Sequence, residues 1–125
     1  MRNKAKILIV DDDVNICKAI KRLLSRDHDY EIEEAHNGLE AAKKIQAARW
    51  DLIILDINLP PTDGYDICFK IREVNKTVKI VAISGYSGAI GKASMEALGA
   101  NCYFEKPFDN NQFRDKIQQL LEEKR

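Results

Sequence analysis

The sequence has no excess of either charge and no long apolar run. Twenty basic residues balance twenty acidic residues among 125, so the formal net charge is zero. Such a balance provides no global field that would attract nucleic acid or an anionic membrane. The apolar runs are far too short to span a bilayer, and the N-terminus has no apolar signal-peptide core. We therefore expect a cytoplasmic protein that binds neither nucleic acid nor a membrane directly.

Cysteine is scarce, and its spacing does not resemble that of a metal site. The three cysteines, Cys17, Cys68 and Cys102, are scattered and form no C-x-x-C pair. None of them lies near His28 or His36 in the sequence at the spacing of metal ligands. We expect buried free thiols, as in proteins of a reducing cytoplasm.

Short apolar runs alternate with amphipathic stretches, without repeats, low-complexity segments or linkers. Strands are expected at 6–10, 30–35, 51–55, 79–83 and 102–104. Helices are expected at 14–25, 38–48, 63–74, 90–98 and 112–123. This alternation favours an α/β fold with a parallel sheet and helices on both faces. Five such units use the whole length, so residues 1–125 are expected to form a single domain.

Several helix ends and one inner face can be predicted in detail. Asn37 is a candidate N-cap, and Glu40 three residues later completes a capping box. Either Asp109 or Asn110 is expected to cap the last helix. The apolar residues available to the inner face of the third helix are Ile67, Phe69, Ile71 and Val74.

Acidic residues follow two of the apolar runs directly. Asp11–Asp13 follow the run Ile7–Val10, and Asp56 follows Leu52–Leu55. The carboxyl ends of parallel strands meet at one edge of the sheet, where the sites of such folds lie. The residues expected at this edge are Asp11, Asp12, Asp56, Ser84 and Lys106. Carboxylates packed together are unfavourable unless a cation joins them or one of them is modified.

The residue types at this edge suit a magnesium site. The carboxylates of Asp11, Asp12 and Asp56 are hard oxygen ligands of the kind Mg²⁺ prefers, whereas Asp13 is expected to cap a helix. A carboxylate held beside Mg²⁺ could attack phosphorus, because the metal orients the donor and neutralises charge. Lys106 could pair with Asp56 and later with a phosphoryl oxygen. Most lysines are ordinary surface residues, but the position of Lys106 after a buried strand and before a proline favours a side chain directed into the site. Ser84 is a hydroxyl donor at the same edge, although taken alone it could equally be a plain loop serine.

Together these residues resemble those of a known family, the receiver domain of two-component response regulators. The matching motifs are Asp11-Asp12 after Ile-Val, Asp56 in Asp-Ile-Asn-Leu-Pro-Pro-Thr-Asp-Gly, Ser84-Gly85 after Val-Ala-Ile, and Lys106-Pro107-Phe108. The resemblance extends from Lys6 to Leu121. It implies a flavodoxin-like, doubly wound sheet of five parallel strands in the order 2-1-3-4-5.

The resemblance also implies roles for the residues at the sheet edge. Asp56 would accept a phosphoryl group from a phosphohistidine of a sensor histidine kinase or a histidine phosphotransfer protein. Asp12, Asp56 and the backbone carbonyl of Asn58 would bind Mg²⁺ directly, and Asp11 would act largely through water. Lys106 would contact the phosphoryl group.

Further roles concern switching and the lifetime of the phosphoryl group. Ser84 would move to bond the phosphoryl group, and the rotamer of Tyr103 would follow; a plain packing role for Tyr103 is the alternative. Asn58 and Tyr86 would tune the lifetime of the phosphoryl group. Tyr86 would do so by shielding the acyl phosphate from water; the alternative is a loop tyrosine without kinetic effect. The Lys106–Pro107 bond would be cis. The domain would promote its own phosphoryl transfer and slow self-dephosphorylation without being an enzyme.

The sequence does not identify the output partner. Gly99–Tyr103 reads Gly-Ala-Asn-Cys-Tyr and lacks the acidic pair of receivers that dimerise to drive DNA-binding domains. We therefore do not expect that dimer. The family places partner binding on segments that here are Ile90–Leu98, Cys102–Phe104 and Gln112–Leu121.

Three other functions were weighed against this interpretation. A haloacid-dehalogenase-type phosphatase needs Thr or Val where Asn15 stands, and it would leave Asp56 unexplained. A flavodoxin-like electron carrier needs a phosphate-binding loop after the first strand, where the acidic triplet would repel phosphate. A receiver-like module that binds partners without phosphorylation remains the main alternative, although it would not need to keep Asp12, Asp56, Ser84 and Lys106 together.

Overall fold

In the computed structural model of the chain, five parallel strands form one sheet in the order β2-β1-β3-β4-β5. The strands are β1 (Lys6–Val10), β2 (Glu31–Ala35), β3 (Leu52–Asp56), β4 (Lys79–Ser84) and β5 (Cys102–Glu105). The structure describes residues 4–26, 28–85 and 88–123. Both the parallel sheet and the strand order implied by the family resemblance are confirmed.

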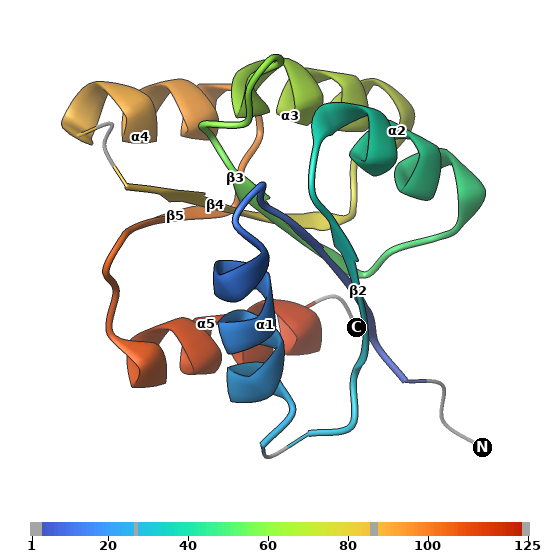
Figure 1. Ribbon diagram of the computed structural model, residues 1–125, viewed down its shortest axis with the longest axis vertical. Coiled ribbons are helices and arrows are strands. Elements are labelled where there is room, and N and C mark those ends of the chain that lie inside the picture. Colours follow the sequence, from blue (N-terminus) through green and yellow to red (C-terminus); the bar gives the residue numbers. More distant parts are fainter. Residues whose placement is uncertain (1–3, 27, 86–87, 124–125) are drawn as a thin grey trace.

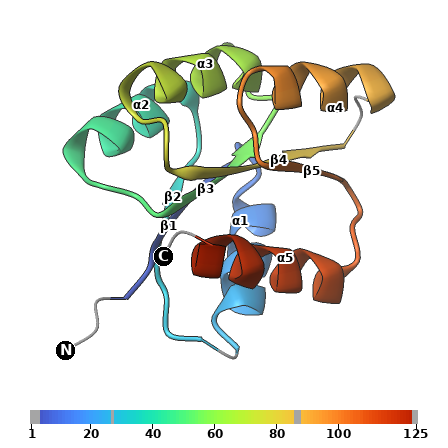
Figure 2. The same ribbon diagram turned by 180° about the vertical axis from the view of Figure 1, so that it is seen from behind.

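Helices cover both faces of this sheet. They are α1 (Val14–Leu24), α2 (Gly38–Ala47), α3 (Gly64–Val74), α4 (Gly88–Ala97) and α5 (Asn110–Glu123). Figures 1 and 2 show α2, α3 and α4 on one face and α1 and α5 on the other. None of the helices in the described part of the chain is both long and apolar enough to cross a membrane.

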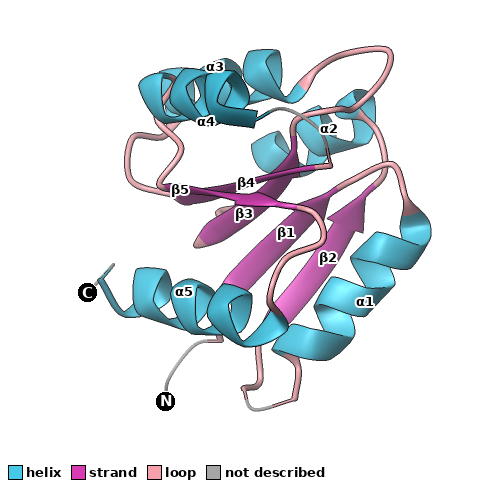
Figure 3. Ribbon diagram, turned by 90° about the vertical axis from the view of Figure 1, so that its left-hand side faces the viewer, coloured by secondary structure: helices cyan, strands magenta, loops and turns pink. Residues whose placement is uncertain are grey.

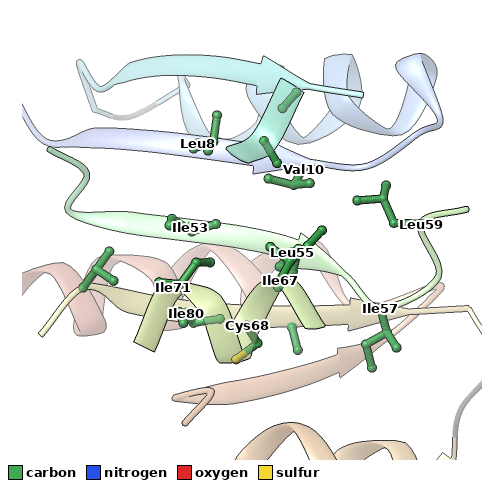
Figure 4. Packing of buried hydrophobic residues seen from close by; sticks show 14 of the residues in the cluster. Leu8, Val10, Ile53, Leu55, Ile57, Leu59, Ile67, Cys68, Ile71 and Ile80 are labelled. Atoms are coloured by element: carbon green, nitrogen blue, oxygen red, sulfur yellow. The ribbon is translucent and has the colours of Figure 1, made fainter. Parts of the chain in front are cut away.

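The central strand β3 is buried along its whole length, which explains its continuous apolar run. Its side chains alternate between the two faces, as the pleat of a strand requires. Ile53 and Leu55 pack with Ile67 and Ile71 of α3 (Figure 4). Leu52 and Ile54 belong to the opposite core, formed with α1 and α5. The strand therefore joins two hydrophobic cores and places Asp56 at its buried end.

The predicted inner face of α3 is partly wrong. Ile67 and Ile71 are buried as expected, but Phe69 is 51% exposed and Val74 is 78% exposed. Phe69 follows Ile67 by two residues, which turns it by about 200° and so away from the sheet. Val74 is the last residue of α3 and lines an open groove between α2 and α3. Cys68 takes the third inward position instead.

Helix ends differ from the prediction by one or two residues. Asp63 is not the first residue of α3 but its N-cap, because its side chain accepts the backbone N–H of Asp66 at 2.8 Å. The last helix begins at Asn110 rather than Gln112, and α4 begins at Gly88 rather than Ile90. The Asp109 carboxylate accepts the N–H of Gln112 at 2.9 Å, which decides between the two candidate caps in favour of Asp109.

Candidate functional site

The structure brings residues from three strand ends into direct contact. Asp11 follows β1, Asp56 ends β3, and Lys106 lies just beyond β5. The Lys106 ammonium lies 2.9 Å from Asp11 Oδ2 and 3.2 Å from Asp56 Oδ2. The backbone N–H of Lys106 donates to the Ser84 carbonyl at 2.7 Å, so the end of β4 holds the lysine backbone in place. One lysine therefore bridges two carboxylates that are distant in sequence.

The carboxylates differ in burial, although they lie close together. Asp11 is fully buried, Asp56 is 4% exposed, and Asp12 is exposed to solvent. One oxygen from each of the three carboxylates lies within 4.8 Å of the others. This set of hard oxygens, open to water on the Asp12 side, fits a magnesium ion that keeps part of its hydration shell.

Burial and charge act in opposite directions on the two bridging groups. Burial and then the charge of Asp11 raise the pKa of Asp56 to about 6, although Lys106 and the Asn58 N–H, which lies 3.0 Å from Asp56 Oδ1, oppose the shift. Burial alone would lower the pKa of Lys106, but its contacts with Asp11 and Asp56 outweigh that effect and raise it. The lysine is therefore charged at neutral pH, whereas ionised Asp56 is held at a cost in free energy.

The turn behind Asp56 depends on a glycine. A Cβ atom at Gly64 would lie 2.6 Å from the Asp56 carbonyl oxygen and 2.6 Å from Ile57 Cα. The Gly64 N–H donates to the Ile57 carbonyl at 2.7 Å, and the Ile57 N–H donates to the Ile83 carbonyl at 2.9 Å. These contacts fix the start of the loop that follows β3 against both α3 and β4.

The third aspartate of the triplet has the local role predicted for it. Asp13 is the N-cap of α1, and its Oδ1 accepts the N–H groups of Asn15 at 2.9 Å and Ile16 at 3.3 Å. Its own N–H donates to Asp11 Oδ1 at 2.9 Å. The cap therefore also orients the buried Asp11 carboxylate.

The remaining predicted residues are Ser84, Tyr103 and Tyr86. Ser84 is fully buried as the last residue of β4, rather than the first residue of the following loop. Tyr103 lies on β5, and its buried hydroxyl has no hydrogen-bond partner among the described residues. Tyr86 lies outside the described residues.

The Lys106–Pro107 bond is cis, as the family resemblance implies. The Pro60–Pro61 bond is also cis, and no pattern in the sequence predicted it.

The expectation that no cysteine lies near a histidine at ligand spacing holds only along the chain. In space, Cys17, Glu34 and His36 each place a potential ligand atom within 4.8 Å of the other two. Sequence spacing could not show this cluster, because Cys17 belongs to α1 whereas Glu34 and His36 belong to the end of β2 and the loop after it. This cluster is separate from that of Asp11, Asp12 and Asp56, which offers only oxygen ligands.

Comparison with known proteins assigns the chain to a family. The family described as the response regulator receiver domain matches residues 7–118. The chain is a response regulator receiver domain. This assignment confirms the resemblance stated from the sequence.

Relatives of this receiver domain occur both as short proteins and as parts of longer ones. The transcriptional regulatory protein ResD of Bacillus subtilis is 35% identical over 119 residues, which are 95% of this chain and 49% of ResD. Sporulation initiation phosphotransferase F of the same organism is 30% identical over 116 residues, which are 93% of each chain. Histidine kinase P4 of Formosa agariphila is 39% identical over 123 residues but is covered over only 9% of its length. The receiver domain thus spans half or less of several relatives.

Solved structures agree with the assignment. A CheY-like response regulator receiver domain protein from Methanospirillum hungatei has a TM-score of 0.91 and 30% sequence identity, with 98% of this chain and 97% of that chain covered. The chemotaxis response regulator CheY4 of Vibrio cholerae has a TM-score of 0.86 and 31% identity, with 94% and 99% covered. Both similarities extend over nearly the whole chain.

Proposed function

We propose that this receiver domain accepts a phosphoryl group on Asp56 from a phosphohistidine and thereby switches the surface that binds its output partner. The observation that carries the proposal is the contact of one lysine with two buried carboxylates, Asp11 and Asp56. A packing role alone would not require three buried or half-buried charged groups at one sheet edge, since each must be desolvated.

The acidic residues would hold Mg²⁺ during the transfer. Asp12, Asp56 and the backbone carbonyl of Asn58 would be direct ligands, with Asp11 acting through water. When bound, Mg²⁺ would neutralise the charge of the phosphodonor and of the carboxylates around it. The hard-oxygen chemistry of these residues and their separation of at most 4.8 Å support this role for the three carboxylates.

In the transfer itself, a carboxylate oxygen of Asp56 attacks the phosphorus atom. A bond forms between that oxygen and phosphorus, the bond between phosphorus and the donor imidazole nitrogen breaks, and the imidazole leaves. The Lys106 ammonium, which neutralises Asp56 in the resting state, then pairs with a phosphoryl oxygen. The high pKa of this lysine keeps it charged for both contacts.

Switching would follow from the same contacts. The Ser84 hydroxyl would donate to a second phosphoryl oxygen and draw the end of β4 towards the site. Tyr103 would turn at the same time, and the lack of a partner for its buried hydroxyl among the described residues supports such a movement. The output surface would consist of α4, β5 and α5, where Ile90 is 82% exposed. Asn58 and Tyr86 would set the rate at which the domain loses its phosphoryl group by self-catalysed hydrolysis.

The phosphodonor would be a sensor histidine kinase or a histidine phosphotransfer protein in the cytoplasm. The relatives named as a histidine kinase and as a sporulation phosphotransferase support this class of partner. The alternative is a receiver-like module that binds its partner without phosphorylation, and the following experiment separates the two.

The experiment is incubation with Mg²⁺ and acetyl phosphate or phosphoramidate, followed by intact-mass measurement. We expect one added phosphoryl group on the wild-type protein, none on Asp56→Asn, and none when the metal is removed with a chelator. Asp13→Asn is the matched control, because asparagine is also a good N-cap, and it should be phosphorylated like the wild type. No adduct on the wild type would favour the module without phosphorylation, and an undiminished adduct on Asp56→Asn would exclude Asp56 as the phosphoacceptor.

A further inference from the structure

A second group of metal-ligating side chains lies beside the acidic site. Cys17 comes from α1, Glu34 from β2, and His36 from the loop between β2 and α2. Figure 3 shows β1 and β2 ending at the same edge of the sheet, with α1 following directly after β1. Cys17 is fully buried, whereas the side chains of Glu34 and His36 are 15% and 34% exposed. A thiol therefore lies beneath a carboxylate and an imidazole that solvent can reach.

The imidazole of His36 is held between two carboxylates. Its Nε2 lies 2.8 Å from Glu34 Oε1, and its Nδ1 lies 3.9 Å from Glu40 Oε1. The same oxygen of Glu40 accepts the backbone N–H of His36 at 2.7 Å. One ring nitrogen thus points to the cluster and the other to a carboxylate outside it, which is how metal-binding histidines are commonly oriented.

The electrostatic surroundings of Cys17 favour a cation. Burial, followed by the charges of Asp11, Glu34 and Asp13, raises the pKa of the thiol to about 12, and Lys106 opposes this only partly. The thiol donates a hydrogen bond to the backbone carbonyl of Asp11 at 3.4 Å. The carboxylates of Asp11, Glu34 and Asp13 around the thiol favour a divalent cation in the same place.

We propose that Cys17 Sγ, the Glu34 carboxylate and His36 Nε2 form a binding site for a zinc-type divalent cation, with water as the fourth ligand. Thiolate, imidazole and carboxylate are all zinc ligands, whereas Mg²⁺ selects oxygen. When the cation binds, the thiol releases its proton to solvent and gives up its hydrogen bond to Asp11. Glu40 is a positioning residue, which acts by orienting His36.

The geometry requires only small side-chain movements, in which His36 Nε2 and Glu34 Oε1, now 2.8 Å apart, separate slightly and both approach Cys17. Bond lengths of about 2.0–2.3 Å to tetrahedral zinc place neighbouring ligand atoms roughly 3.5 Å apart. The ligand atoms here lie at most 4.8 Å apart. Because Glu34 and His36 are partly exposed, their side chains can move by the remaining distance towards the buried Cys17. The site is independent of the proposed phosphorylation, and its test has a readout that does not involve phosphoryl transfer.

The test is a Co²⁺ titration followed by absorption spectroscopy. The reduced protein is first stripped of bound metal, and excess Mg²⁺ is then added before Co²⁺. Mg²⁺ is present so that the acidic site does not contribute. We expect one equivalent of Co²⁺ to produce a thiolate-to-cobalt charge-transfer band and intense tetrahedral visible bands, and Zn²⁺ to abolish both. Cys17→Ala should lose the charge-transfer band. Cys102→Ser and Asp12→Asn are the controls and should retain it.

Two further variants separate ligand from positioning residue. His36→Gln changes a partly exposed side chain, so this variant should fold like the wild type. It should lower the Co²⁺ affinity by more than tenfold. Glu40→Gln should keep the charge-transfer band but bind roughly 10–100-fold more weakly, as for other residues that orient a metal ligand. The proposal would be overturned if the wild type gave no thiolate band, if Cys17→Ala kept it, or if His36→Gln bound Co²⁺ as tightly as the wild type.

Discussion

Two groups of side chains flank the same end of β1 but differ in how their charge is balanced. The acidic site consists of Asp11, Asp12, Asp56 and Lys106, and the thiol-imidazole site of Cys17, Glu34 and His36. In the acidic site, Asp11 and Asp56 are both in contact with Lys106. In the thiol-imidazole site, the Glu34 carboxylate lies 2.8 Å from His36 Nε2, and this imidazole carries a charge only when it is protonated. One site thus contains a lysine between two carboxylates, whereas the other pairs a carboxylate with an imidazole ring.

This difference indicates how one small domain can offer two chemically distinct sites a few residues apart. The acidic site has only oxygen ligands and a lysine in contact with two of the carboxylates. The other has sulfur, nitrogen and oxygen ligands and a buried thiol without a charge of its own. Donor type rather than position should therefore decide which cation each site takes.

The largest effect on stability is expected at Gly64, which packs behind Asp56 in the acidic site. Gly64→Ala should destabilise the fold by about 2–4 kcal/mol, because its Cβ would overlap the Asp56 and Ile57 backbone. Urea unfolding measures this change. Gly85→Ala is the matched control, since a Cβ there meets nothing within 4 Å, and it should change stability by less than about 0.5 kcal/mol. Equal stability of the two variants would show that the turn behind Asp56 is not tightly packed.

The next effect concerns the raised pKa of Asp56. A carboxyl group whose pKa rises from 3.8 to about 6 on folding binds its proton more tightly in the folded state. Its contribution to stability therefore falls as the pH rises from about 4 to above 6. Asp56→Asn, which stays neutral, should be more stable than the wild type by about 1–3 kcal/mol at pH 7 without metal.

The pH dependence of this gain is the decisive measurement. Thermal or urea unfolding at several pH values should show the advantage of Asp56→Asn shrinking to near zero below about pH 3, where the wild-type carboxyl is protonated in both states. A gain that stayed constant across this range would mean that the charge of Asp56 is not its cause.

Metal-dependent stability compares the two sites directly. A cation at ten times its dissociation constant should stabilise the wild type by about 1.4 kcal/mol, because it binds only the folded state. Mg²⁺ should lose this effect in Asp12→Asn but keep it in His36→Gln, and Zn²⁺ should behave in the opposite way. Thermal shifts with each ion measure both. Loss of both responses in either variant would indicate one shared site instead of two.

The smallest expected effect belongs to Asp13, whose side chain caps α1. Asp13→Ala should cost about 1 kcal/mol, because the N–H groups of Asn15 and Ile16 lose their acceptor. Urea unfolding measures this loss, and Asp13→Asn should restore most of it. The alanine variant should still gain one phosphoryl group on Asp56, and its failure to do so would assign Asp13 a part in the acidic site.

Much of the fold and of the acidic site could be predicted from the sequence. The run Leu52–Leu55 is apolar without interruption because both of its faces are buried, so it predicts a central parallel strand. Aspartates directly after two such strands must meet at one sheet edge, since parallel strands end on the same side. The order of the strands came from the family resemblance rather than from any pattern in the residues.

Other features depended on contacts that only the tertiary structure provides. Helical periodicity did not show that Val74 points to solvent, because it shares a helix face with Ile67 and its burial depends on where α3 lies over the sheet. Nor could spacing reveal that Lys106 lies within 3.2 Å of both Asp11 and Asp56.

The sequence by itself determined the strand pattern and the residue types at the sheet edge, because strand alternation and turn chemistry act over a few neighbouring residues. Only the tertiary structure decided that Cys17 meets Glu34 and His36. That contact requires α1 to pack beside the end of β2, and no local property of the chain specifies the packing of one element against another.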